Sequence, residues 1–238
     1  MPLPAITVLT YTLIPVAATV AGGVIAAYRP PSSRQRSYAQ HFAAGVVFAA
    51  LAVELLPSVI HEHAPFAALA GFALGTALML LLRWLTEKSN GQEARSPLGL
   101  IAPVAIDITI DGLLIGIGFA AGAKEGKLLT VALSLEVLFL GLAVAASLSK
   151  AGASRERIIG TTCVLAFLLA AGALIGTSLL GGLKGPALEA MLSFGCAALL
   201  YLVTEELLVE AHEVPETSFT TATFFIGFLL LLMLDMLG

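Results

Sequence analysis

The chain has 238 residues, of which 58% are hydrophobic and only 12% are charged, and its formal net charge is −4. A soluble domain of this size carries about 25% charged residues and could not bury so much apolar surface. The composition therefore excludes a soluble enzyme, a nucleic-acid-binding protein and a disordered chain. It indicates a protein that crosses a membrane several times.

Eight apolar segments are long enough to cross a bilayer core of about 30 Å, which takes about 20 helical residues. Because lipid cannot hydrogen-bond to free backbone groups, each segment is predicted to be an α-helix. The predicted spans are 5–28, 39–60, 66–85, 98–121, 128–150, 158–181, 186–209 and 219–237. We therefore expect an all-α fold with a single transmembrane domain over residues 1–238, and its longest polar loop from about Thr86 to Pro97.

The basic residues predict which way the spans run. An even number of spans places both termini on one side, and cytoplasmic loops carry the excess of Lys and Arg. Nine basic residues fall on one side of the predicted spans: Arg29, Arg34, Arg36, Arg83, Lys88, Arg95, Lys150, Arg155 and Arg157. Three fall on the other side: Lys124, Lys127 and Lys184. We expect the nine to be cytoplasmic and both termini to be extracytoplasmic.

A short motif occurs at the ends of two spans. Residues 54–65 read ELLPSVIHEHAP, and residues 206–215 read ELLVEAHEVP. The second and seventh spans run in opposite directions, so the motif suggests an inverted repeat of spans one to three against spans six to eight. Spans four and five then lie between the halves, a 3+2+3 arrangement that is typical of transporters with a substrate near the membrane midplane. The alternative is a chance similarity between two leucine-rich helix ends.

Six acidic residues lie inside the predicted spans, where no Lys or Arg is deep enough to pair with them: Glu54, Asp107, Asp111, Glu136, Glu205 and Glu206. An ionisable group at membrane depth is costly and is a functional hypothesis by default. Without a basic partner such acids must be protonated, solvated in a cavity or bound to a cation.

Three of these acids come near the midplane. At 1.5 Å per residue, Asp107 lies about 14 Å into span four and Asp111 lies one turn further. Their i, i+4 spacing puts them on one helix face. Glu136 lies about 12 Å into span five from the other surface. If the two faces meet, the carboxylates form a site that suits a divalent cation and for which protons and metal compete.

Further residues predict a route on either side of this site. We expect the outer entry to use three residues: Glu54, His61 and His63. We expect the inner exit to use four: Glu205, Glu206, His41 and His212. Simpler interpretations stay open, with His61 and His63 as ordinary surface residues, His41 as an interfacial residue and Glu206 as a buried, neutral, hydrogen-bonded side chain.

The sequence resembles the ZIP family (Zrt/Irt-like divalent metal transporters), as a divergent prokaryotic-type member. Residues 41–57 (HFAAGVVFAALAVELLP) resemble that family's second helix, and residues 197–212 (AALLYLVTEELLVEAH) resemble its seventh. Residues 106–116 (IDITIDGLLIG) resemble its fourth-helix metal motif, in which His-Asn-x-x-Asp/Glu-Gly is typical. The resemblance covers most of the chain and implies eight spans, outward termini and inverted triplets of helices.

The fourth span departs from the family pattern at two positions. Asp107 stands where the family usually has His, and Ile108 stands where it usually has Asn, whereas Asp111 matches the family acid. The resemblance also implies that Glu205 and Glu206 are inner-side metal ligands.

The fifth and sixth spans depart further. Glu136 falls at the first ligand position, often His or Gln, while Val137 and Leu140 fall at the two polar positions that follow. The sixth span has no acid, although many family members place a Glu there. The family's two-metal centre is therefore expected to be reduced to a single site of three residues: Asp107, Asp111 and Glu136.

The sequence thus predicts a carrier that moves zinc, manganese or ferrous iron into the cytoplasm, with the metal as substrate and no organic cofactor. The alternative is a ZIP-like homologue with an altered substrate, or with a non-transporting sensor or scaffold role. A membrane enzyme is least favoured, since no nucleophile–base set or HExxH motif accompanies the histidines. We expect a multi-pass protein of the inner or plasma membrane whose partners are lipid and metal ions, not nucleic acid, and leave a homodimer open.

Overall fold

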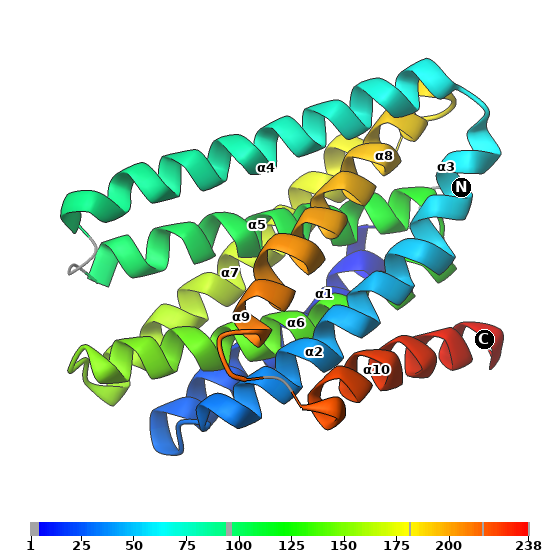
Figure 1. The fold of residues 1–238 in the computed structure, drawn as a ribbon. Helices are drawn as coiled ribbons and strands as arrows, with labels where there is room; N and C mark the ends of the chain where they lie inside the picture. Colours follow the sequence, from blue (N-terminus) through cyan, green and yellow to red (C-terminus); the bar gives the residue numbers. More distant parts are fainter. Residues whose placement is uncertain (1–4, 94–96, 181, 216, 238) are drawn as a thin grey trace.

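The structure is a computed structural model that describes residues 5–93, 97–180, 182–215 and 217–237, apart from the side chains of 5, 62, 86–93, 97–100 and 180. Within these ranges all regular structure is helical (Figure 1). Eight helical segments are long and apolar enough to cross a membrane, which confirms the predicted number. Their elements are α1 (Ala5–Tyr28), α2 (Ser33–Ala50), η1 (Leu51–Leu55), α3 (Leu56–Glu62), α4 (Pro65–Glu93), α5 (Pro97–Ala121), α6 (Ala123–Lys150), α7 (Arg155–Leu180), α8 (Pro186–Tyr201), η2 (Leu202–Leu207), α9 (Leu208–Ala211) and α10 (Ser218–Leu237).

Several helices extend beyond the predicted spans. The helix α4 continues to Glu93, so most of the segment expected to be a polar loop is helical. The helix α2 begins at Ser33, where the Ser32 side chain and Gln35 form a capping box. Hydropathy marks only the part of a helix that lies in lipid, whereas polar residues with good helix propensity extend it into water. The helices are therefore longer than the predicted spans at these ends.

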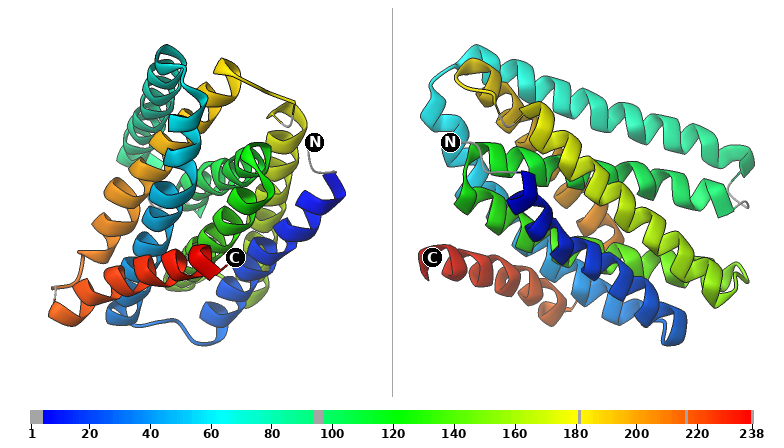
Figure 2. Two further views of the ribbon diagram at one scale, coloured as in Figure 1. Left: turned by 90° about the vertical axis from the view of Figure 1, so that its right-hand side faces the viewer. Right: turned by 180° about the vertical axis from the view of Figure 1, so that it is seen from behind.

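The helices pack in pairs that an inverted repeat requires. The helix α1 packs against α6, as α7 packs against α5, and α10 packs against α2, as α4 packs against α8. Exchanging the first three spans with the last three, and α5 with α6, maps each pair onto the other. Figure 2 shows the bundle from two further sides. The 3+2+3 arrangement predicted from the sequence motif thus describes how the helices are packed.

Glycines hold two equivalent helix pairs together. A methyl group at Gly45 would lie 1.9 Å from the carbonyl oxygen of Phe224, where α2 meets α10. A methyl group at Gly71 would lie 1.9 Å from the carbonyl oxygen of Ala190, where α4 meets α8. Close backbone approach at small residues is how helices associate in lipid. Both halves therefore attach their peripheral helix, α10 or α4, in the same way.

The second and seventh spans each contain a π-helical turn that sequence reasoning missed. The turn η1 carries Glu54, and the turn η2 carries Glu205 and Glu206. Such turns insert one residue into the helical register, are often found at functional sites and have no reliable composition signal. They occupy equivalent places in the two halves and change the direction in which the acids project.

The two ends of the bundle differ in charge. The end with the α1–α2, α6–α7 and α9–α10 connections carries Arg29, Arg34, Arg36, Arg155 and Arg157, and we call it the basic end. Both chain termini lie at the other end, together with the turn from α3 to α4 (Figure 1), and we call it the opposite end.

Candidate metal centre

The helices α5 and α6 bring three carboxylates together inside the bundle. Asp107 and Asp111 lie one turn apart on α5, and Glu136 lies on the facing side of α6. Each offers one oxygen, and these three oxygens all lie within 4.8 Å of one another. The i, i+4 spacing puts the two aspartates on one face, and packing of α5 against α6 supplies the third ligand. The residues singled out as a midplane site are thus neighbours.

Burial leaves this cluster with unmet bonding capacity. Asp111 and Glu136 are each 1% exposed, and Asp111 Oδ2 and Glu136 Oε2 have no hydrogen-bond partner among the described residues. The ion pairs between described side chains involve other acids. A buried carboxylate without such a partner requires a proton or a cation. The cluster therefore has the donor set and the electrostatic demand of a divalent cation site.

The residues at the altered family positions are apolar and buried. Ile108 on α5 and Val137 on α6 are both 0% exposed and pack in the hydrophobic core. Neither side chain carries an atom that coordinates metal.

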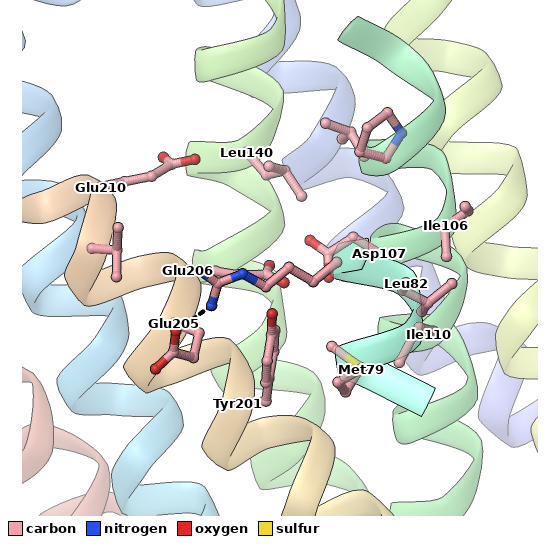
Figure 3. A pocket seen from close by; sticks show the side chains of 14 residues that line it. Met79, Leu82, Ile106, Asp107, Ile110, Leu140, Tyr201, Glu205, Glu206 and Glu210 are labelled. Carbon is pink, nitrogen blue, oxygen red and sulfur yellow. Dashed lines mark hydrogen bonds and ion pairs between the residues drawn. The ribbon is translucent and has the colours of Figure 1, made fainter. Parts of the chain in front are cut away.

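A cavity of 340 Å³ leads to the cluster from between α4, α5 and the seventh span. Its polar lining includes Asp107, Glu205, Glu206 and Glu210 (Figure 3), and we call it the acidic cavity. The side chains of Asp107 and Glu206 contact each other. A narrow cavity of 30 Å³ lies beside it, is lined by Asp107, Glu136, Glu206, Glu210 and Gln40, and has room for about one water molecule.

The prediction that no basic residue could pair with the intramembrane acids is wrong for Glu205. Arg83 Nη1 on α4 donates to Glu205 Oε2 at 2.7 Å, and both side chains are nearly half exposed. The dashed line in Figure 3 marks this pair. Long basic side chains reach along a helix from a span end, which a residue count along the sequence does not reveal. Glu205 is thus an ion-paired residue at the cavity rim, whereas Glu206 lines the cavity beside Asp107.

A second ion pair lies at the opposite end, beside one of the predicted intramembrane acids. Lys124 Nζ at the start of α6 lies 2.6 Å from Asp235 Oδ1 near the end of α10. Glu54 is only 5% exposed, and its side chain hydrogen-bonds with that of Asp235. The predicted entry acid is therefore enclosed in a small charged cluster of Glu54, Lys124 and Asp235, which we call the outer cluster.

The two loop histidines predicted at the entry lie next to each other. His61 and His63 are exposed, and their rings stack with centroids 6.5 Å apart. His63 also has a left-handed backbone, with φ of 54°, and ends α3. This geometry is equally compatible with a surface role and with a role at a metal entry.

The two predicted exit histidines meet at the basic end. His41 on α2 and His212 after α9 have ring centroids 5.3 Å apart, although they are far apart in sequence. His41 Nδ1 donates to the Ser37 carbonyl at 2.9 Å, and His212 Nδ1 donates to the Leu208 carbonyl. Sequence reasoning missed Gln40, whose Nε2 donates to Glu210 Oε2 beside them. Its position one residue before His41 was the only available signal.

The fold and the buried carboxylates define a multi-pass membrane protein with an internal site suited to cations. The ZIP zinc transporter family model matches residues 90–235, so the chain belongs to this family of divalent metal transporters. The match confirms the resemblance seen in the sequence and covers the fourth to eighth spans. Members are transporters rather than enzymes, and the plasma membrane is their typical location. Comparison with curated proteins gave no match.

Proposed function

We propose that this chain carries a divalent metal ion into the cytoplasm through a single site formed by Asp107, Asp111 and Glu136. The observation that carries the proposal is the meeting of three carboxylate oxygens within 4.8 Å, two of them on residues that are almost fully buried. No basic side chain in the described part of the chain forms an ion pair with them. The metal is the cargo and supplies the positive charge that the site lacks.

The charge of the two ends supports an orientation of the chain in the membrane, and import is proposed on that orientation. Cytoplasmic loops carry the excess of basic residues, so we assign the basic end to the cytoplasm and both termini to the outside. The ion then enters past Glu54, His61 and His63 and leaves through the acidic cavity. Glu206 and Glu210 line that exit and offer oxygens between the cluster and the cytoplasm.

Zinc, manganese and ferrous iron are the proposed substrates. An all-oxygen site is harder than one that contains imidazole, which favours manganese and ferrous iron relative to a histidine-containing site. Intrinsic affinity nevertheless follows the order in which zinc binds more tightly than either. Selectivity therefore has to be measured with all three metals.

One observation favours a second candidate function. Ile108 and Val137 are fully buried where the family places polar ligands, so a second metal cannot be held there. A homologue that lost transport would keep one metal site as a sensor or scaffold, or would carry a different solute. Metal binding without metal uptake would identify this alternative.

Uptake by purified protein in liposomes tests the proposal. We expect entry of at least one of zinc, manganese, ferrous iron and cadmium, and we expect Asp111→Asn to abolish it because the variant lacks one charged ligand. Metal affinity in detergent should fall by more than about tenfold in the same variant. Glu156→Gln removes an exposed carboxylate at the start of α7 and should behave like the native protein. Folded native protein that admits none of the four metals would refute the carrier.

The pH dependence of metal binding tests the chemistry of the cluster. Protons and metal compete for the same carboxylate oxygens, so metal binding releases protons. Affinity should therefore rise with pH, by a factor of about ten per pH unit for each proton displaced. Isothermal titration in buffers of different ionisation enthalpy measures both the affinity and the number of protons. An affinity that does not change between pH 5.5 and 7.5 would contradict this chemistry.

A further inference from the structure

A second large cavity lies at the basic end, where the α1–α2 connection meets α6. Its volume is 560 Å³, which is within the range of small-molecule sites. One side is polar and is lined by Arg29, Gln35, Arg36 and Gln40. The other side is apolar and is lined by Ile25, Phe139, Leu142 and neighbouring residues. We call this space the arginine cavity.

The positive charge beside the arginine cavity is only partly neutralised by carboxylates. Arg36 Nε is buried and has no hydrogen-bond partner among the described residues. Another guanidinium nitrogen, Nη2, lies 3.6 Å from Glu213 Oε2, a long contact to a side chain that is 65% exposed. Arg29 takes part in none of the ion pairs between described side chains. Two guanidinium groups beside one cavity suit a phosphate, for which arginine is the preferred ligand.

Gln40 completes the polar wall. It is 5% exposed, and its Nε2 donates to Glu210 Oε2. The groups of this wall that can meet an anion are therefore the guanidinium groups of Arg29 and Arg36.

The apolar wall places this site in contact with lipid. Ile25 lies in the last turn of α1 and is 51% exposed, on a helix that is apolar enough to span the membrane. Phe139 and Leu142 lie deeper along α6, toward Glu136. A ligand that fills the arginine cavity therefore needs a phosphate at one end and hydrocarbon at the other. Basic pockets between spans at the cytoplasmic surface are known to bind acidic lipid headgroups.

We propose that the arginine cavity binds the headgroup of an anionic phospholipid, with the phosphate on Arg29 and Arg36. The first part of an acyl chain lies against Ile25 and Leu142. The site is distinct from the acidic cavity, with which it shares no lining residue. It does not depend on the proposed transport, since lipid binding is measured without metal.

Native mass spectrometry of the full chain in detergent tests this proposal. Phosphatidylglycerol, phosphatidylcholine and inorganic phosphate are titrated separately. We expect tight binding of one phosphatidylglycerol molecule, with weaker binding of the other two. In the double variant Arg29→Gln/Arg36→Gln this affinity should fall roughly thirtyfold, a factor of about five for each arginine.

The matched control removes two positive charges from the same end. Arg34 and Arg157 are exposed and do not line the arginine cavity, so Arg34→Gln/Arg157→Gln should keep native affinity. Equal weakening in both double variants would show general surface attraction and overturn the proposal. Equal binding of phosphatidylcholine would overturn the role of the anionic headgroup. Saturation by inorganic phosphate that displaces the lipid would reassign the site to a free anion.

A second variant guards against misfolding of the arginine double variant. Leu142→Trp fills the apolar wall and leaves both arginines in place, and it should lower phosphatidylglycerol affinity by several-fold. Retention of native lipid binding in this variant would overturn the assignment of the acyl chain to that wall. Size-exclusion profiles and thermal unfolding confirm that each variant is folded.

Discussion

The two ends of this bundle use the same short motif in different ways. Glu206 in η2 and Glu54 in η1 each precede two leucines in equivalent spans. Glu206 lines a cavity of 340 Å³ that reaches the carboxylate cluster. Glu54 is 5% exposed, belongs to the outer cluster and lines none of the three cavities described above.

This difference shows how an inverted repeat can hold a site open on one side at a time. Transporters of this architecture achieve alternating access when their repeats move relative to each other around a fixed site. Here the acidic cavity reaches Asp107 from between α4, α5 and the seventh span, while the outer cluster ties η1 and α10 to α6 at the opposite end. We therefore expect equivalent packing substitutions to have similar effects in the two halves. Substitutions of the two equivalent acids should have different effects.

The largest expected effect concerns packing, in which the halves are alike. Gly45→Ala and Gly71→Ala each place a methyl group 1.9 Å from a backbone oxygen of the neighbouring helix. Because the backbones must move apart, each variant should lose about 3 kcal/mol or more of stability, seen as a large drop in melting temperature in detergent. Gly160→Ala meets nothing within 4 Å and should be neutral or slightly stabilising. A large loss in only one of the first two variants would break the equivalence of the halves.

An intermediate effect distinguishes the two equivalent acids. Glu206→Gln should weaken metal binding in detergent by about tenfold, because Glu206 contacts the proposed ligand Asp107 and lines the acidic cavity. Glu54→Gln should leave equilibrium binding unchanged and slow uptake into liposomes, because Glu54 lies at the proposed entry and is enclosed in the outer cluster. Titration calorimetry and uptake measured on the same preparations separate the two. Equal weakening of equilibrium binding by both substitutions would refute the assignment of one open and one closed end.

The smallest effects concern the two ion pairs. Arg83→Gln removes a pair whose side chains are 49% and 43% exposed, so stability should change by less than about 1 kcal/mol.

Lys124→Gln leaves Asp235 beside buried Glu54 without a cation and should loosen the opposite end. A cysteine introduced as Ser58→Cys, with Cys163 and Cys196 replaced by Ser, should then react several-fold faster with a water-soluble thiol reagent. Faster labelling in Arg83→Gln but not in Lys124→Gln would show that the outer cluster does not hold the opposite end closed.

Much of the site could be predicted because its signals are local. Asp107 and Asp111 share a face through helical periodicity alone, and Glu136 reaches the same depth by counting residues at a fixed rise. Membrane-spanning segments are equally local, since each must satisfy its backbone within itself. The ends of α2 and α4 were harder to place, because helices continue into water where hydropathy has no signal.

The sequence by itself determined that this is an eight-span membrane protein with uncompensated acids at midplane depth, because hydropathy and helical periodicity are properties of single segments. Tertiary structure decided which acids have partners. Arg83 pairs with Glu205, and Lys124 pairs with Asp235. The partners lie on different helices far apart in sequence, where helical periodicity gives no information. It also decided that Glu206 faces a cavity while Glu54 is enclosed. The same Glu-Leu-Leu sequence is exposed or buried according to which helices pack against it.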